Sequence, residues 1–290
     1  MSGKINQEDK QNYLRKPEWL KIKLPDAYYY ANIKDKLNTN KLHTICESGQ
    51  CPNIGECWKS GTATFMILGD ICTRSCRFCA VKTGKPLPPD TGEPDRVAST
   101  VNEMNLKHCV ITSVDRDDLE DGGSEIWSET VTAIKNLGTN ITIECLIPDF
   151  KGHWNNLQKV MDSHPEVISH NLETVRRLTK EIRIFARYDL SLQVIKKISD
   201  AGIISKSGIM VGLGETKEEV ICTMDDLVAV GCKIFTIGQY LQPSKNNFPV
   251  KKYVTPEEFT EYKNIGLQKG FRFVESGPLV RSSYHAEAQV

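Results

Sequence analysis

The sequence lacks any run of about eighteen consecutive apolar residues, the length that a helix needs to cross the hydrocarbon core of a bilayer. The first residues also lack the apolar stretch of a secretory signal, and Glu8 and Asp9 do not suit an acid-poor transit peptide. We therefore expect no membrane partner and a cytoplasmic location.

The chain also lacks an excess of either charge, because 37 Lys and Arg residues balance 37 Asp and Glu residues. Without a net positive field, nothing attracts the phosphates of a nucleic acid in general, so we expect no nucleic-acid partner. The 290 residues are 39% hydrophobic and 26% charged, as in ordinary soluble globular proteins. We expect a monomer.

Cysteine is not scarce: the chain has ten, and six of them are clustered. In a reducing cytoplasm, clustered cysteines serve metal binding or catalysis rather than disulfides. The other four are isolated within apolar runs, where we predict that they fill the core. These four are Cys109, Cys145, Cys222 and Cys232.

From Ala63 onward, short β-branched runs alternate with amphipathic stretches, which is the pattern of βαβ units. We predict an α/β fold, a partial or full parallel (β/α)6 TIM-like barrel, followed by one more helix and strand over 256–274. The predicted strands span 63–68, 109–114, 141–147, 167–171, 207–213 and 233–240. The predicted helices span 95–105, 125–137, 154–163, 173–179, 192–201 and 217–230. Residues 1 to about 40 read as a polar, irregular arm.

Directly after the first predicted strand lie Cys72, Cys76 and Cys79, in a C-x3-C-x2-C spacing. In parallel α/β barrels the chemistry sits at the carboxyl ends of the strands. Thiolates select iron–sulfur clusters or zinc, and structural zinc usually takes four protein ligands. A [4Fe–4S] cluster held by three cysteines leaves one iron open, and S-adenosylmethionine (SAM) can bind there and be cleaved to a 5′-deoxyadenosyl radical. A zinc site is the alternative.

A second triplet, Cys46-x4-Cys51-x5-Cys57, precedes the first strand. It needs a fourth ligand or an open site, and a fourth ligand must come from a distant cysteine, another residue type or a small molecule. The alternative is a structural zinc knuckle.

The C-x3-C-x2-C spacing, with the aromatic Phe78 before its last cysteine, resembles the radical SAM superfamily. The two triplets together resemble lipoyl synthases, and matching stretches run in the same order over about residues 45 to 287. They include Pro52-Asn53-Ile54-Gly55-Glu56-Cys57-Trp58, Thr112-Ser113-Val114-Asp115-Arg116-Asp117-Asp118-Leu119, Ile147-Pro148-Asp149-Phe150, His170-Asn171-Leu172-Glu173-Thr174 and Arg281-Ser282-Ser283-Tyr284. One departure is Asn247, where the resemblance leads us to expect a histidine.

The resemblance implies three segments: an N-terminal arm with the auxiliary-cluster cysteines (1–60), a radical SAM barrel (61–250) and a C-terminal extension with the Arg-Ser-Ser-Tyr motif (251–290). It implies two [4Fe–4S] clusters and SAM as cofactors. Cys46, Cys51 and Cys57 would hold the auxiliary cluster, with Ser283 as its fourth, labile and catalytic ligand. That cluster would donate two sulfur atoms to carbons six and eight of a protein-bound octanoyl-lysine.

The implied partners are octanoylated lipoyl carrier domains, such as H protein or the E2 subunits of 2-oxoacid dehydrogenases, and a flavodoxin or ferredoxin reductant. A radical SAM methylthiotransferase is the alternative enzyme, although its N-terminal triplet is usually more widely spread. From another class, the alternative is an electron carrier or iron–sulfur scaffold without catalysis.

Residues near the strand ends are candidates for the SAM pocket. The resemblance places the backbone of Gly122 and Gly123 at the methionine amino group and the segment with Met210 along the adenine. Asn171 and Glu173 are candidates for the ribose hydroxyls, and Arg187 for the carboxylate. The alternatives are a plain turn at the glycines, a helix cap at Glu173 and a surface ion pair at Arg187. Three residues are candidates for the acyl channel, namely Gln239, Tyr240 and Gln242, and a core role is the alternative for Tyr240.

Overall fold

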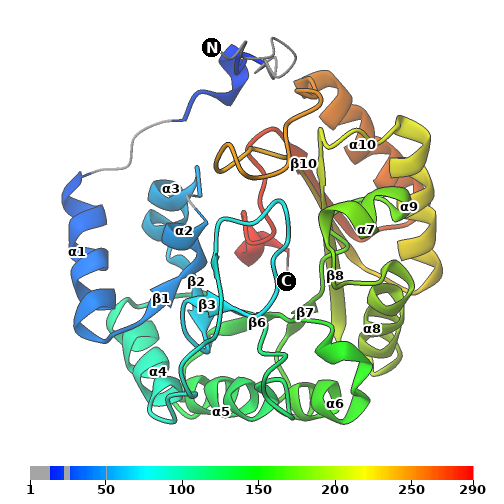
Figure 1. The fold of residues 1–290 in the computed structure, drawn as a ribbon. Helices are drawn as coiled ribbons and strands as arrows, with labels where there is room; N and C mark the ends of the chain where they lie inside the picture. Colours follow the sequence, from blue (N-terminus) through cyan, green and yellow to red (C-terminus); the bar gives the residue numbers. More distant parts are fainter. Residues whose placement is uncertain (1–13, 23–26, 50, 290) are drawn as a thin grey trace, which may run out of the picture.

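A computed structural model describes residues 14–22, 27–49 and 51–289 of the chain. Its centre is an eight-stranded sheet in the order β1-β2-β5-β6-β7-β8-β9-β10. Every neighbouring pair in this sheet is parallel except β1 and β2. Figure 1 shows the strands curving into a partial barrel with the long helices outside it. The described residues form no pairing between β1 and β10, so the barrel is open there.

The sheet strands are β1 (His43–Thr44), β2 (Thr62–Ile67), β5 (His108–Ser113), β6 (Thr142–Leu146), β7 (Val167–Ser169), β8 (Ile204–Val211), β9 (Ile234–Gln239) and β10 (Phe273–Gly277). A separate two-stranded sheet contains β3 (Ile71–Cys72) and β4 (Lys82–Thr83). The α-helices are α1 (Ala27–Thr39), α2 (Ile45–Ser48), α3 (Ile54–Lys59), α4 (Glu93–Glu103), α5 (Ser124–Lys135), α6 (Trp154–Asp162), α7 (Thr179–Ile182), α8 (Tyr188–Asp200), α9 (Lys217–Ala229) and α10 (Pro256–Lys269). Short 3-10 turns are η1 (Glu18–Leu20), η2 (Phe150–Gly152), η3 (Arg176–Leu178) and η4 (Ala286–Ala288).

All six predicted parallel strands are present as β2 and β5 to β9, and the predicted (β/α)6 TIM-like arrangement is confirmed. The final helix and strand are α10 and β10. β10 adds a further parallel strand beside β9, in register from Phe273 opposite Ile234 to Gly277 opposite Gly238. Because β1 precedes residue 60 and β10 follows residue 251, the sheet runs through all three predicted segments.

The prediction of an irregular arm over residues 1 to 40 is wrong for α1. Ile33 and Leu37 lie four residues apart and are buried, and the Tyr30 ring stacks on Trp58 with ring centroids 5.4 Å apart. This apolar stripe packs against the barrel, and tertiary packing of such a stripe stabilises a short helix. Residues 1–13 and 23–26 of the predicted arm lie outside the described residues.

The predicted helix over 173–179 is also wrong at its start, because helical structure begins only at Arg176. Glu173 instead continues the pairing of β7 with β8: its amide donates to the Gly208 carbonyl at 2.9 Å, and the Met210 amide donates to the Glu173 carbonyl at 2.9 Å. These sheet bonds hold Glu173 at a φ of 65°, which does not fit a regular right-handed helix.

The sheet is covered by two apolar clusters, one around Trp58 and Trp127 and the other around Phe235 and Tyr240. The predicted core cysteines Cys109, Cys145 and Cys232 are buried within them. Cys222 is exposed, so its prediction as core is wrong; it lies on the outer side of the amphipathic helix α9. Over the described residues, no helix is long and apolar enough for a membrane span.

Candidate active site at the strand ends

The first cysteine triplet lies on the loop between β2 and α4, at the carboxyl end of the sheet. β3 and β4 pair in parallel and the Gly84 amide donates to the Cys72 carbonyl at 3.0 Å, which brings the two ends of the loop together. Burial, with smaller contributions from neighbouring thiols and carboxylates, raises the pKa of Cys76 to about 12 and that of Cys79 to about 11. Thiols in such surroundings become stable thiolates only beside a positive charge or a metal.

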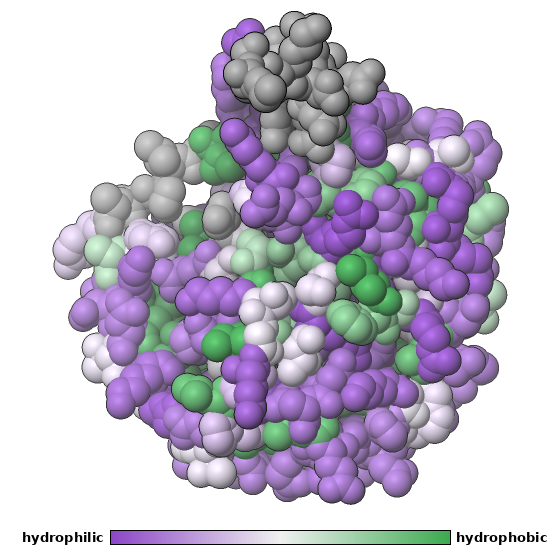
Figure 2. Space-filling model, in the orientation of Figure 1, coloured by the Kyte–Doolittle hydropathy of each residue, from purple (hydrophilic) through white to green (hydrophobic). Residues whose placement is uncertain are grey.

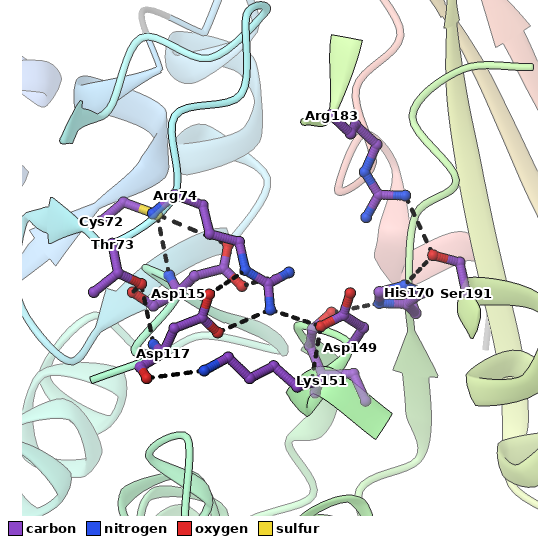
Figure 3. Close-up of polar contacts among 11 residues, drawn as sticks. Cys72, Thr73, Arg74, Asp115, Asp117, Asp149, Lys151, His170, Arg183 and Ser191 are labelled. Atoms are coloured by element: carbon purple, nitrogen blue, oxygen red, sulfur yellow. Dashed lines mark hydrogen bonds and ion pairs between the residues drawn. The ribbon is translucent and has the colours of Figure 1, made fainter. Parts of the chain in front are cut away.

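Arg74, inside the same loop, attaches it to the ends of β5 and β6. Its side chain is 6% exposed and its guanidinium donates to both carboxylate oxygens of Asp117, at 2.8 and 2.9 Å. It also donates to Asp149 at 2.8 Å and lies 3.4 Å from Asp115. Figure 3 shows the three carboxylates arranged around the one guanidinium. The bidentate geometry fixes both the position and the plane of the arginine, and therefore the loop.

Backbone amides point at two of the sulfur atoms in this loop. The amides of Arg74 and Asp115 donate to Cys72 Sγ at 3.4 and 3.3 Å, and the Val81 amide donates to Cys79 Sγ at 3.5 Å. Hydrogen bonds to sulfur favour the thiolate and are among the factors that set the reduction potential of an iron–sulfur cluster.

Two further segments hold the other side of the loop. The Asn247 side-chain amide donates to the carbonyls of Arg77 and Cys79, at 3.2 and 2.9 Å, and the Phe248 amide donates to Arg77 at 2.8 Å. The Arg77 amide in turn donates to the Ile182 carbonyl of α7 at 2.9 Å. Asn247, the residue found where we expected a histidine, thus contacts the first cysteine triplet through backbone atoms.

The second triplet lies on two short helices beside β2 and on the connection between them. Cys46 is on α2, Cys57 is on α3, and the Cys51 amide donates to the Cys46 carbonyl at 2.9 Å. Burial is the main reason that the pKa of Cys46 rises to about 12, and the nearby Cys51 raises it further. Burial and both other thiols raise the pKa of Cys57, so these three sulfurs are also close together.

The C-terminal segment meets this triplet after more than 220 intervening residues. The Asn53 side chain donates to the Leu279 carbonyl at 2.7 Å, and the charge of Arg281 lowers the pKa of Cys51 against the larger effect of burial. The Tyr284 hydroxyl lies 3.3 Å from the carboxylate of Glu56, the residue just before Cys57. Figure 1 shows this end of the chain inside the ring of strands.

Ser283 therefore lies between Arg281, which faces Cys51, and Tyr284, which faces Glu56. Its side chain is half-buried, and its hydroxyl makes no hydrogen bond within the described part of the chain. Ser282, by contrast, accepts a hydrogen bond from the Asn171 side chain at 2.7 Å. The two serines thus differ: Asn171 near the end of β7 donates a hydrogen bond to Ser282, and no described residue makes such a bond to the Ser283 hydroxyl.

Asn171 and Glu173 lie together at the end of β7, where the Asn171 side-chain amide donates to Glu173 at 3.0 Å. The side-chain oxygen of Asn171, Oδ1, is buried without a hydrogen-bond partner among the described residues. Burial raises the pKa of Glu173, and the charge of Arg183 partly offsets it. An unsatisfied buried acceptor beside a carboxylate suits a ligand with hydroxyl donors.

The arginine that the structure brings to this site is Arg183, which is 8% exposed and donates to the Leu172 carbonyl at 3.1 Å. Its charge lowers the pKa of Cys76 against the effect of burial, so it faces the first triplet. Arg187 is exposed at the start of α8, and its side chain makes no hydrogen bond or ion pair within the described residues. The pairing of Arg187 with a carboxylate stays a prediction.

The remaining predicted pocket residues fall into two groups. Phe78 and Met210 are partly buried against the same apolar cluster. Gly122 and Gly123 have positive φ values of 61° and 84° at the start of α5, and Gly122 lines a pocket of about 390 Å³ beside Arg74. A side chain at Gly123 would meet Leu68 at 2.4 Å, so glycine is needed there for close packing as well as for the turn.

Comparison with known proteins identifies the family. Residues 66–227, more than half of the chain, match the model of the radical SAM superfamily, and residues 1–51 match the N-terminal domain of lipoyl synthase. Lipoyl synthase of Treponema denticola is 58% identical over 276 residues, which cover 95% of each chain. Mitochondrial lipoyl synthase of Nematostella vectensis is 57% identical with the same coverage. The chain belongs to the lipoyl synthase family.

Solved structures agree on the fold of this family member. Methylornithine synthase superposes with a TM-score of 0.56 at 12% identity, covering 87% of this chain and 79% of that one. HydG, a maturase of [FeFe]-hydrogenase, superposes with a TM-score of 0.57 at 15% identity, covering 89% and 74%. These likenesses support the radical SAM barrel.

The curated relatives do not favour the alternative assignment as a methylthiotransferase.

The residues present suit the cofactors that a radical SAM lipoyl synthase implies. Each triplet contains three buried or partly buried thiols, and soft sulfur donors are what iron–sulfur clusters take. Among the described residues, no group of three His, Cys, Asp or Glu side chains surrounds a single point closely enough to bind one metal ion. The cysteines that hold an iron–sulfur cluster need no such arrangement, because each binds a different iron. The unsatisfied Asn171 oxygen suits a ribose hydroxyl of SAM.

Sequence reasoning missed several residues that form the site, above all Arg74, Asp149 and Arg183. Asp149 follows the end of β6, so its place at a strand end was a usable signal. Arg183 has no such signal, because a 3-10 turn and α7 separate it from β7. Of the candidates for the acyl channel, Gln239 and Tyr240 are buried: the Gln239 side-chain amide donates to three carbonyls, and the Tyr240 hydroxyl donates to the Phe248 carbonyl at 2.7 Å. Gln242 donates to the Asn247 carbonyl at 2.9 Å.

Proposed function

We propose that the chain is a lipoyl synthase that uses SAM and two [4Fe–4S] clusters to insert two sulfur atoms into a protein-bound octanoyl-lysine, at carbons six and eight. The observation that carries the proposal is the meeting of the Arg-Ser-Ser-Tyr segment with the N-terminal triplet, from opposite ends of the chain. A radical SAM barrel alone requires no such meeting. A second metal centre completed by Ser283 does.

The two triplets have separate tasks in this proposal. When bound, the cofactors supply a carbon-centred radical for hydrogen abstraction and sulfide for the new carbon–sulfur bonds. Cys72, Cys76 and Cys79 hold one cluster, and Cys46, Cys51, Cys57 and Ser283 hold the other. The seryl oxygen is a harder ligand than a thiolate and therefore the weakest of the four.

The chain's own polar groups orient SAM. Asn171 and Glu173 accept hydrogen bonds from the ribose hydroxyls. The backbone of Gly122 and Gly123 lies at the methionine amino group. Phe78 and Met210 line the apolar side of the SAM pocket. Arg183 or Arg187 pairs with the carboxylate, since a guanidinium matches a carboxylate in geometry. Arg183 is the better placed, because it is buried and faces Cys76.

The function is tested by incubating the anaerobically reconstituted protein with SAM, a chemical reductant and an octanoyl-lysine peptide. Mass spectrometry of the peptide should show two added sulfur atoms, and 5′-deoxyadenosine should accumulate. Iron should be about eight per chain, as two cubane clusters require. Zinc in place of iron, or 5′-deoxyadenosine without sulfur in the peptide, contradicts the proposal.

The role of Ser283 is tested by Ser283→Cys, with Ser282→Cys as the matched control. A cysteine at 283 should preserve the auxiliary cluster but slow sulfur insertion, because a thiolate holds the iron more firmly than the seryl oxygen does. The variant at 282 loses only the hydrogen bond from Asn171. Unimpaired turnover of the variant at 283 would rule the role out.

The proposed partners are octanoylated carrier domains, such as H protein or the E2 subunits of 2-oxoacid dehydrogenases, and a flavodoxin or ferredoxin. The carrier is proposed because the octanoyl group of the substrate is attached to a lysine of a folded domain. The monomeric state and the cytoplasmic location remain predictions.

A further inference from the structure

Next to the first cysteine triplet, the surface exposes two consecutive apolar residues. Ile184 and Phe185 are 52% and 57% exposed, although Ile182 just before them is fully buried. They follow α7 in the long connection from β7 to α8, which lies at the carboxyl end of the strands. On the face that looks down onto these strand ends, Figure 2 shows hydrophobic side chains exposed among hydrophilic ones.

The same connection is strongly basic. Residues 176–187 contain five Lys or Arg residues and a single acidic residue, Glu181. Arg176 and Arg177 pair with acidic side chains of α8 and α9, and Arg183 is buried. Lys180 and Arg187 are exposed, and neither forms an ion pair within the described residues. Glu181 itself lies 3.3 Å from Arg77 of the cysteine loop.

We infer that Lys180, Ile184 and Phe185, with Arg187 beside them, form the surface on which the octanoylated carrier domain docks; we term it the rim surface. The inference rests on the proposed function. The lysine-bound acyl chain must reach the strand ends while its folded domain stays outside. A docking surface must therefore border that end of the barrel.

The contacts and charges of residues 176–187 support the carrier domain as the partner that docks there. The hydrogen bond from the Arg77 amide to Ile182 joins it directly to the loop of Cys76 and Cys79. An exposed aromatic side chain suits the apolar centre of an interface, and unpaired cations at its edge attract an acidic partner face. The rim surface thus matches a folded domain that presents carboxylates around its acylated lysine.

The test compares the double variant Lys180→Glu, Phe185→Ser with wild type on two substrates, with dithionite as reductant. The substrates are an octanoylated carrier domain and a short octanoyl-lysine peptide. We expect the KM for the carrier to rise about tenfold, through loss of an aromatic anchor and reversal of a charge. The rate with the peptide should stay within about twofold, since neither side chain touches the cysteines. Added salt should raise the KM for the carrier in wild type more than in the variant.

The matched control is Lys233→Glu, Leu267→Ser, which makes the same kind of change at the opposite end of the barrel. Lys233 is exposed just before β9, and Leu267 is 44% exposed near the end of α10. The control should leave the KM for the carrier unchanged. An unchanged KM in the rim variant, or an equal loss with the peptide, overturns the docking role. A defect that appears only when flavodoxin replaces dithionite also overturns it, by assigning the surface to the electron donor.

Failure of the proposed function gives a different result. In that case wild type itself adds no sulfur to the peptide, whatever the state of the rim surface.

Discussion

The two cysteine triplets are held in opposite ways. The triplet of Cys72, Cys76 and Cys79 is surrounded by buried charges and backbone bonds from the ends of the neighbouring strands, with Arg74 joined to three carboxylates. In the triplet of Cys46, Cys51 and Cys57, the first and last cysteines lie on helices of four and six residues, and the contacts of the triplet with the C-terminal segment are few. The contacts around the first triplet come from the barrel itself. Those around the second triplet come from an N-terminal and a C-terminal segment of the chain.

This difference matches the tasks proposed for the two metal centres. A cluster that cleaves SAM repeatedly must keep the same geometry, and a network of buried ion pairs provides that because removing one partner is costly. A cluster that gives up sulfide must open. Segments with few buried contacts open at low cost in free energy, so the weakly held C-terminal motif suits that task.

The largest expected effect separates the two triplets completely. Cys76→Ala should reduce 5′-deoxyadenosine formation to background, because the cluster that binds SAM loses a ligand. Cys51→Ala should leave 5′-deoxyadenosine formation in place and remove sulfur insertion. Cys222→Ala, which alters an exposed cysteine, is the control and should change neither. Product analysis by liquid chromatography and mass spectrometry measures both. If Cys51→Ala also abolishes 5′-deoxyadenosine, the two tasks are not separate.

The next effect concerns stability. Arg74→Met keeps most of the side-chain volume but leaves Asp117 and Asp149 without their cation in a buried site. We expect a loss of about 3 kcal/mol in the free energy of unfolding, measured by urea denaturation. Arg176→Met, which removes a half-exposed arginine with two acidic partners, should lose less than about 1 kcal/mol. Similar losses in both variants would mean that the network around Arg74 does not fix the loop.

The first triplet and its surroundings were largely predictable, because strand periodicity placed the cysteines at a strand end. The second was not. Spacing alone left its fourth ligand open, and Ser283 came only from the family resemblance, since no local pattern relates residues 57 and 283. The helix α1 escaped prediction because its apolar stripe of Ile33 and Leu37 is short, and the helix is stabilised by tertiary packing such as the stack of Tyr30 on Trp58. Arg183 escaped because η3 and α7 separate it from the end of β7, so its place in the chain does not mark it as a strand-end residue.

A smaller effect on stability comes from His170, which lies behind Asp149 in the network around the first triplet. Its ring nitrogens are 2.9 Å from the Ile147 carbonyl and from the Ser191 hydroxyl, and burial, with the charge of Arg183, lowers its pKa to about 4. The unfolded histidine takes up a proton below about pH 6.5, whereas the folded one does so only near pH 4. Stability should therefore fall as the pH drops through this window.

Between pH 7 and pH 5 the expected loss from His170 is about 2 kcal/mol in the free energy of unfolding. His170→Gln should show a correspondingly weaker dependence over the same range, measured by urea denaturation of the reconstituted protein. A variant as sensitive to pH as wild type would assign the loss to other groups.

The smallest effect tests how the C-terminal segment is held. Asn53→Ala removes the hydrogen bond to Leu279 and should cost about 1 kcal/mol locally. Hydrogen exchange should then become faster over residues 279–289 and stay unchanged over residues 72–79. Asn247→Ala is its counterpart, because it removes two bonds to the first triplet, and it should speed exchange over 72–79 only. If either substitution speeds exchange at both triplets, the two surroundings open together, and the auxiliary cluster cannot be released without loosening the one that binds SAM.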